Sequence, residues 1–193
     1  MAADILIVDA DVVPVGKDQK QHVEVARDIA GSFNHLYGEV LKLPTDRILP
    51  EAGVVPGIDG QKMSKSYGND IGIFLEGKAL MDRVMAIVTD SAPVEAPKDA
   101  DANNVFNLVK LFASPGETAE WRARFATGGL RYSEIKKRLI ALLDERFGAA
   151  RERRKELAKD PAYVDGVLRE GAERARGIAA ATLARCRRAC GID

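Results

Sequence analysis

The apolar residues of this chain change their spacing near residue 75, and this change limits the folds that the chain can adopt. Before that point, short apolar runs such as Ile5–Val8 are separated by segments rich in Gly and Pro, a pattern typical of α/β structure. After it, apolar residues recur every three or four positions, as they do in amphipathic helices. We therefore predict an α/β part over residues 1–75 and an all-α part over residues 76–193.

Local signals divide the first part into elements. Ile5–Val8 is either a strand or a buried helical segment, which periodicity alone cannot separate. A helix is expected to begin at Asp18, which forms a capping-box pattern with Gln21, and to end at Gly38. Alternation over residues 39–43 predicts a strand with one buried face. The expected connections are a turn at residues 14–16 and a Pro/Gly-rich loop over residues 44–72.

Capping residues divide the second part into consecutive helices. Ser or Asn before a helix, and Pro at its first position, are common start signals. The expected starts are near Leu80, after Asn103 or Asn104, at Pro115 after Ser114, at Ser133, and at Pro161 after Asp160. The predicted buried faces are Leu80, Val84, Ile87 and Val88, then Ile135, Leu139, Leu142, Leu143 and Phe147, and finally Val164, Val167, Leu168, Ala175, Ile178, Ala179, Thr182 and Leu183.

The charge of the chain is unevenly distributed, although the formal total is zero. Residues 1–130 carry a net charge of −6, with 13 Lys/Arg against 19 Asp/Glu, whereas residues 131–193 carry +6, with 16 against 10. A solvated helix surface with ion pairs four residues apart explains such a segment. A binding surface for a polyanion such as RNA explains it as well, and the sequence leaves both interpretations open.

Composition excludes several classes of protein. No run approaches the roughly 18 to 20 apolar residues needed to span a bilayer, and the start lacks the charged region of a signal peptide. We therefore expect a cytoplasmic protein without a membrane partner. Cys186 and Cys190 lie four apart without a nearby His, so we interpret them as ordinary helix thiols and expect no metal ligands from the protein.

The sharpest chemical signal is the pentapeptide Lys62-Met63-Ser64-Lys65-Ser66 in a glycine-flanked loop. Two ammonium groups on long side chains, beside hydroxyl groups, suit the binding of a triphosphate. Lys62 and Lys65 would stabilise charge that accumulates on a departing pyrophosphate, which makes them candidate catalytic residues. The alternative is a solvated polar loop that matches the pattern by chance.

This pentapeptide is the KMSKS signature of class I aminoacyl-tRNA synthetases, and residues 56–61 resemble the segment that precedes it there. Residues 1–6 (MAADIL) and 13–22 (VPVGKDQKQH) resemble the tryptophanyl-tRNA synthetases in particular. The resemblance covers most of the chain. It implies the second half of a Rossmann-like catalytic domain over residues 1–75 and a helical anticodon-binding domain over residues 76–193, whose last helix packs back on the catalytic part.

The resemblance also implies the site residues. Asp4 would accept the indole N–H of tryptophan, Met1 would pack on the indole ring, and Gln19 would hold the polar end of the amino acid. His22 would orient its neighbours on a helix face without transferring protons. The residues that would meet ATP are Gly16, Lys17, Asp18, Val55, Lys62, Met63, Ser64, Lys65 and Ser66. The implied substrates and partners are L-tryptophan, ATP with Mg²⁺, tRNA-Trp and a second copy of the chain in a homodimer.

One part of the family pattern is missing. The first half of these enzymes carries a His-Ile-Gly-His type motif, and neither His22 nor His35 has the neighbours for it. We therefore expect that about 120 to 130 residues of a usual enzyme are absent and that the chain alone does not form the adenylate efficiently. A stand-alone helical RNA-binding fragment and a tyrosyl-type or paralogous synthetase remain alternatives. Asp4 after Met1-Ala2-Ala3 argues against the tyrosyl type.

Overall fold

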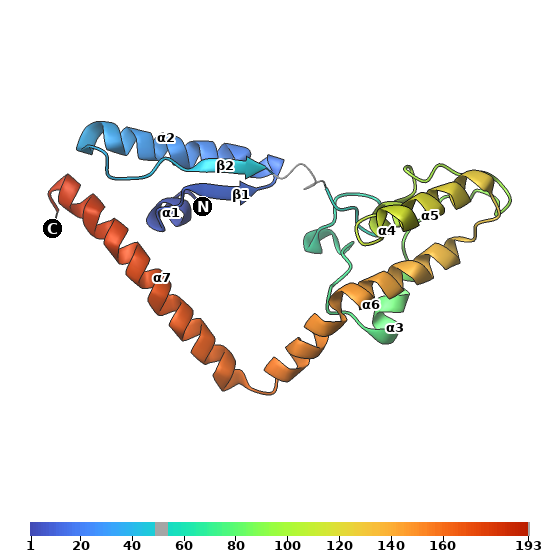
Figure 1. Ribbon diagram of the computed structural model, residues 1–193. Coiled ribbons are helices and arrows are strands. Elements are labelled where there is room, and N and C mark those ends of the chain that lie inside the picture. Colours follow the sequence, from blue (N-terminus) through green and yellow to red (C-terminus); the bar gives the residue numbers. More distant parts are fainter. Residues whose placement is uncertain (49–53, 193) are drawn as a thin grey trace. The chain divides into compact units, whose positions relative to one another are not determined.

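The computed structural model describes residues 1–48 and 54–192, and its chain forms two units (Figure 1). We call Met1–Gly53 together with Asp160–Asp193 the discontinuous unit, and Val54–Lys159 the central unit. The expected α/β part and helical part both occur, but the units divide near residue 53 and not near residue 75. Whether either unit corresponds to an anticodon-binding domain stays a prediction. No helix in the described ranges is both long and apolar enough to cross a membrane.

The discontinuous unit begins with a β-α-β arrangement. Strand β1 (Val12–Val15) pairs in parallel with β2 (Thr45–Ile48), and helix α2 (Lys20–Tyr37) makes the connection that a parallel pair requires. Helix α1 (Ala2–Ile7) settles the open question about residues 5–8 in favour of a helix. Ile5, Val23 and Ala26 form a small core that joins α1 to α2.

Several expectations for residues 1–48 are wrong. The strand expected at residues 39–43 is irregular, because the Asn34 side chain holds this segment by accepting from the Val40 and Leu41 N–H groups and donating to Leu41 O. The turn expected at residues 14–16 is instead the end of β1. The helix does not begin at Asp18, which lies in a 3₁₀ turn, Lys17–Gln19, before α2.

Helix α7 (Pro161–Cys190) completes the discontinuous unit. It begins as predicted, with the Asp160 carboxylate accepting from Tyr163 N at 3.0 Å. The expected apolar face is largely solvent-exposed, and Thr182 is the buried residue of this helix. Near its other end, Arg185 Nη2 lies 2.9 Å from Asp9 Oδ1, just after α1. The contact between α7 and α1 therefore lies in the second half of α7.

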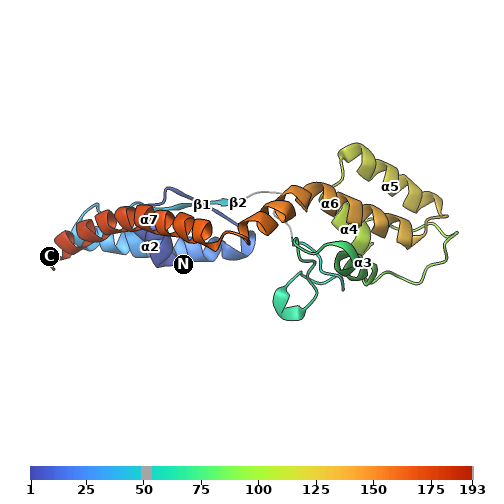
Figure 2. The ribbon, with the colours of Figure 1, turned by 90° about the horizontal axis from the view of Figure 1, so that it is seen from below.

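The central unit contains four helices around one apolar core (Figures 1 and 2). They are α3 (Gly77–Met85), α4 (Asn104–Val109), α5 (Pro115–Thr127) and α6 (Tyr132–Leu157). Caps form at Asn103 and Ser114 as predicted, with side-chain oxygens accepting from Phe106 N and Glu117 N. Helix α6 instead begins after Arg131 without a side-chain cap. The fully buried residues include Leu80, Val84, Phe106, Phe125, Ile135 and Leu139.

Two cationic side chains join the helices of this unit. Lys136 on α6 is only 8% exposed, and its ammonium donates to Met85 O and Ile87 O at the end of α3. Arg138 donates through Nε and Nη2 to the two carboxylate oxygens of Glu117 on α5, at 2.5 and 3.0 Å. These paired hydrogen bonds lower the pKa of Glu117 from its ordinary 4.5.

The Glu117–Arg138 pair predicts a specific acid sensitivity. Because the pKa of Glu117 is lowered in the folded state, its stabilising effect is present above about pH 4.5 and is lost as the pH falls through the folded-state pKa. Glu117→Gln should lower the free energy of unfolding at pH 7 and flatten its decline toward pH 3.5, as measured by urea unfolding. Glu152→Gln, at an exposed pair with Lys155, is the matched control and should change much less. An unchanged acid decline in Glu117→Gln would contradict this assignment.

Candidate active-site loop

The KMSKS segment begins on a short hairpin, residues 55–63, whose strands are joined by backbone hydrogen bonds. Gly57 N donates to Gln61 O at 2.7 Å, and Met63 N donates to Val55 O at 2.9 Å. Pro56 and Lys62 form an antiparallel bridge between them. Gly60 turns the chain at the tip with φ of +82°, a conformation that side chains with a Cβ rarely adopt. The hairpin thus has a defined backbone conformation.

Apolar side chains turn one side of this hairpin inward. Ile58 and Met63 pack against the apolar core of the central unit, whereas Lys62, Lys65 and Ser66 are solvent-exposed. Because Met63 points to the core, the neighbouring lysine side chains can reach solvent. The pentapeptide therefore presents its ammonium groups outward from a fixed base.

A 3₁₀ turn, Lys65–Tyr67, ends the pentapeptide. The Ser64 hydroxyl caps it by accepting from Ser66 N at 3.3 Å, and Gly68 closes it in the left-handed region with φ of +63°. Asn69, which follows, is only 3% exposed and hydrogen-bonds back into the hairpin. The local sequence thus positions Lys65 at the start of a helical turn.

Side chains from two helices hold the two ends of this segment. Asn104, on α4, donates through Nδ2 to Gly57 O at 2.8 Å. Arg83, on α3, donates through Nε to Asp70 O at 2.7 Å and through Nη2 to Gly68 O. The KMSKS segment is therefore attached to the helical core at its entry and at its exit.

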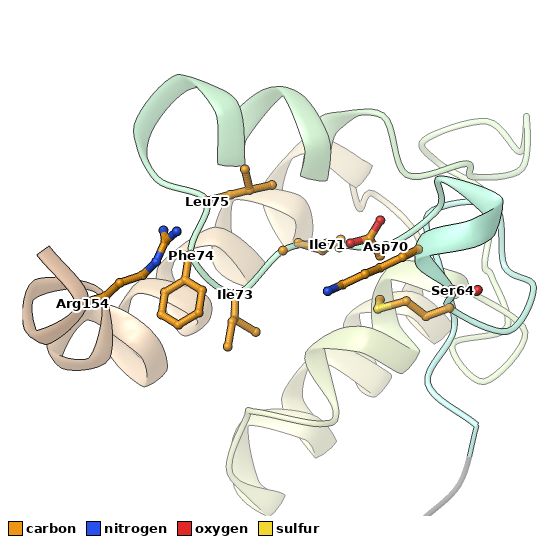
Figure 3. Close-up of a pocket in the computed structure, with 10 residues that line it drawn as sticks. Ser64, Asp70, Ile71, Ile73, Phe74, Leu75 and Arg154 are labelled. Carbon is orange, nitrogen blue, oxygen red and sulfur yellow. The ribbon is translucent and has the colours of Figure 1, made fainter. Parts of the chain in front are cut away.

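A cavity of about 600 Å³ lies beside the exit of the loop (Figure 3). Its wall is mostly apolar, and the segment from Asp70 to Leu75 forms much of it. Arg154, on α6, lies over the Phe74 ring at 4.6 Å from the ring centroid. Ser64 and Lys65 also line this cavity, so it adjoins the pentapeptide.

The residues expected to bind tryptophan lie in the discontinuous unit. Met1 caps the start of α1, and its amino group lies 3.0 Å from Asp4 Oδ2. The Asp4 side chain is 86% exposed. Ile5, next to it, is buried against α2, so helix packing leaves the Asp4 carboxylate in solvent.

The first group of residues expected to meet ATP also lies in this unit. Gly16 follows β1 and precedes the 3₁₀ turn that contains Lys17, Asp18 and Gln19. A Cβ at Gly16 would lie 2.8 Å from Asp18 Oδ1, so a larger residue would displace that side chain. Gln19 Nε2 donates to Asp18 Oδ2 at 3.4 Å, and His22 is exposed on α2. These side chains share one short segment at the end of β1.

The second group, Val55 and Lys62–Ser66, is brought together in the central unit. Val55 O accepts a hydrogen bond from Met63 N, so the backbone of Val55 lies next to the pentapeptide. Asn69, Arg83 and Asn104 were not predicted as supports of the loop, because their bonds to it depend on tertiary packing. Gly68-Asn69, a common turn signal, was the only local indication of the first of them. The roles of the predicted site residues stay predictions.

Comparison with known proteins identifies the family. A family model described as tRNA synthetases class I (W and Y) matches residues 1–148. The chain belongs to this family. A tryptophan–tRNA ligase of Rhodopirellula baltica is 49% identical over 192 residues, and one of Fusobacterium nucleatum is 49% identical over 193 residues. A crystal structure of tryptophanyl-tRNA synthetase from Campylobacter jejuni, complexed with ADP and tryptophan, matches with a TM-score of 0.85 and 44% identity, over 99% of this chain.

The chain matches only part of these synthetases. It spans 60% and 59% of the two curated relatives and 60% of the Campylobacter jejuni chain. The expected family and the expected class I fold are therefore confirmed for the matched part. All of the KMSKS segment falls within residues 1–148. The activity of the complete relatives is assigned to this chain only as a proposal.

The hydrogen bonds from Arg83 to the exit of the loop lead to a prediction about how the loop can be released. Arg83→Met removes the donors to Gly68 O and Asp70 O, so the free energy of unfolding should fall by about 1 to 2 kcal/mol. Trypsin should then cleave faster after Lys62 and Lys65, as followed by mass spectrometry. Arg122→Met is the matched control, because its ion pair with Asp101 is exposed and remote from the loop. Equal acceleration in both variants would show that Arg83 does not hold the loop.

Proposed function

We propose that this chain provides the KMSKS-bearing part of a tryptophan–tRNA ligase. The observation that carries the proposal is the intact Lys62–Ser66 pentapeptide, whose lysines are exposed on a hairpin fixed to the helical core. The 49% identity to two tryptophan–tRNA ligases supports tryptophan as the amino acid. The reaction joins tryptophan to ATP, giving tryptophanyl-adenylate, and then transfers the amino acid to tRNA-Trp.

The lysines act in the first step. The carboxylate of tryptophan attacks the α-phosphorus of ATP, and the bond from that phosphorus to the oxygen bridging to the β-phosphate breaks. Negative charge accumulates on the leaving pyrophosphate, where Lys62 and Lys65 supply two positive charges. The Ser64 and Ser66 hydroxyls are short donors beside them. Mg²⁺ enters with ATP as part of the substrate.

The remaining contacts follow from residue chemistry. Asp4 accepts the indole N–H, since an indole nitrogen can only donate, and the Met1 thioether packs on the ring. Gln19 holds the polar end of tryptophan. Gly16, Lys17 and Asp18 meet ATP at the end of β1, where a backbone without a Cβ allows close approach. Val55 contributes backbone contacts to adenine.

The proposal extends to tRNA and to a second copy of the chain. The basic residues 131–193 supply positive surface for tRNA-Trp, and a homodimer is expected from the family resemblance. Cytoplasmic location stays a prediction. An RNA-binding fragment without catalysis would share the basic residues but would bind RNA without any dependence on ATP. A tyrosyl-type enzyme would share the pentapeptide but would use tyrosine.

The first test is the ATP–pyrophosphate exchange reaction. The chain spans 60% of the Rhodopirellula baltica relative, so we expect no tryptophan-dependent exchange by the chain alone. We define the complemented complex as this chain purified with the part of that relative that it does not match. This complex should exchange with tryptophan and not with tyrosine. Exchange only with tyrosine would indicate a tyrosyl-type enzyme, and salt-sensitive RNA binding without any exchange would favour the RNA-binding fragment.

The second test separates catalysis from binding. In the complemented complex, Lys65→Ala should lower kcat for exchange by about 100-fold, because a charge that stabilises the transition state is lost. The KM for tryptophan should change little, since Lys65 faces the phosphates. Lys78→Ala, an exposed lysine on α3 outside the loop, is the matched control and should leave both constants unchanged. Equal losses in kcat and in tryptophan affinity would mean that Lys65 only binds.

A further inference from the structure

Asn69 is a buried side chain whose polar atoms all face the KMSKS hairpin. It is 3% exposed. Its Oδ1 accepts from Ser64 N at 2.7 Å, and its Nδ2 donates to Lys62 O at 3.1 Å and to Asp59 Oδ1 at 2.9 Å. Its backbone carbonyl also accepts from Ile58 N at 2.8 Å. One residue thus bonds to four positions of the hairpin.

The chemistry of these partners requires a side-chain amide. The Ser64 N–H can only donate, so it needs an oxygen facing it, whereas Lys62 O and the Asp59 carboxylate can only accept and need N–H groups. A carboxylate at position 69 would face two acceptors. An apolar residue would leave buried backbone groups without partners, which is costly. Asparagine meets all three requirements at once.

The side-chain amide of Asn69 bonds to the backbone on both sides of Met63 in the sequence. Lys62 O precedes that residue and Ser64 N follows it, and both are held by the same amide. Met63 N is held by Val55 O, and its side chain packs on the apolar core. The backbone from Lys62 to Ser64 is therefore constrained on both sides. This stretch contains the origin of the Lys62 side chain and leads directly into Lys65.

Gly57 provides the space for this amide. A Cβ at Gly57 would lie 2.5 Å from both Cγ and Nδ2 of Asn69, closer than real contacts allow. The requirement is steric, because the backbone of Gly57 is not in the left-handed region. Position 57, where the hairpin begins, therefore requires a residue without a Cβ, because the Asn69 side chain occupies that space.

We propose that Asn69 is a positioning residue that fixes the backbone of Lys62–Ser64 and thereby aims the two lysines at the leaving pyrophosphate. This inference rests on the proposed function. Asn69 is buried beneath the loop, and its side-chain hydrogen bonds go to the hairpin. Its effect arises because charges already held in place need no reorganisation during the reaction. The hydrogen bonds to Lys62 O and Ser64 N come from Asn69, which lies outside the pentapeptide.

The test is Asn69→Asp, which keeps the size of the side chain and replaces both N–H donors with an acceptor. At pH 7.5 the new carboxylate would lie against Lys62 O and Asp59, so the hairpin should open. In the chain alone, amide hydrogen exchange measured by NMR should become at least about 10-fold faster at Ser64 and at Gln61, whose N–H donates to Asp59 Oδ1. In the complemented complex, kcat for pyrophosphate exchange should fall about 10- to 100-fold, with the KM for tryptophan changed less than about twofold.

A pH series adds a readout that a general loss of stability would not give. Two adjacent carboxylates disfavour ionisation of both, so the carboxyl at position 69 in Asn69→Asp should take up a proton as the pH falls toward about 5. Once protonated, it can donate to Asp59 and accept from Ser64. Protection of the Ser64 amide, relative to its intrinsic exchange rate, should therefore recover in the variant and stay constant in the unmodified chain.

Asn34→Asp is the matched control. Asn34 is also a side-chain amide that bonds to a nearby backbone segment, but in the discontinuous unit and in the reverse pattern, with one bond donated to Leu41 O and two accepted from backbone N–H groups. The same substitution there removes only the donor to Leu41 O, and it should leave exchange at Ser64 unchanged. Asn69→Ala, which introduces no charge, should open the hairpin at every pH and serves if Asn69→Asp fails to fold.

The outcomes separate this inference from the proposed function. If the unmodified complemented complex shows no tryptophan-dependent exchange, the proposed function fails, and hydrogen exchange still decides whether Asn69 holds the hairpin. If Ser64 stays protected in both Asn69 variants, the hairpin does not depend on Asn69 and the inference is wrong. If the hairpin opens while kcat is unchanged in an active complex, Asn69 holds the loop but does not position the lysines, which also overturns the inference.

Discussion

The packing of Ile58 and Met63 against the helical core determines which side chains of the KMSKS loop can reach a substrate. Met63 is the one apolar residue of the pentapeptide, and because it packs on the core, Lys62 and Lys65 are left exposed to solvent. Without that contact, a segment with glycines at 57, 60 and 68 would have many backbone conformations of similar energy. The packing of these two side chains thus determines which face of the charged loop turns outward.

The parts of the fold that were predicted correctly are governed by local chemistry. Ser114 and Asp160 cap helices because their side-chain oxygens lie within three residues of the N–H groups that they satisfy. The face with Ile135 and Leu139 is buried because apolar residues at helical spacing follow one another along α6. Signals of this type can be recognised from a few neighbouring residues. The pentapeptide is another local signal, because its residue types indicate its chemistry without any tertiary contact.

The errors came where distant residues decide the outcome. Residues 39–43 alternate like a strand, but Asn34 captures the backbone of this segment, and the strand forms at Thr45–Ile48. The apolar residues of α7 repeat like a core helix, yet most are exposed. The supports of the loop were missed for the same reason. Arg83 lies 15 residues from Gly68, and Asn104 lies 47 residues from Gly57, so no local pattern joins them.

The discontinuous unit has a consequence for the order in which the chain folds during its synthesis. The central unit is one uninterrupted stretch, so its packing needs no residue of α7. The discontinuous unit needs segments from both sides of that stretch, so its ion pair between Asp9 and Arg185 can form only after the whole central unit has been synthesised. The discontinuous unit is therefore completed after the central unit, and its exposed apolar residues would be accessible to chaperones during that interval.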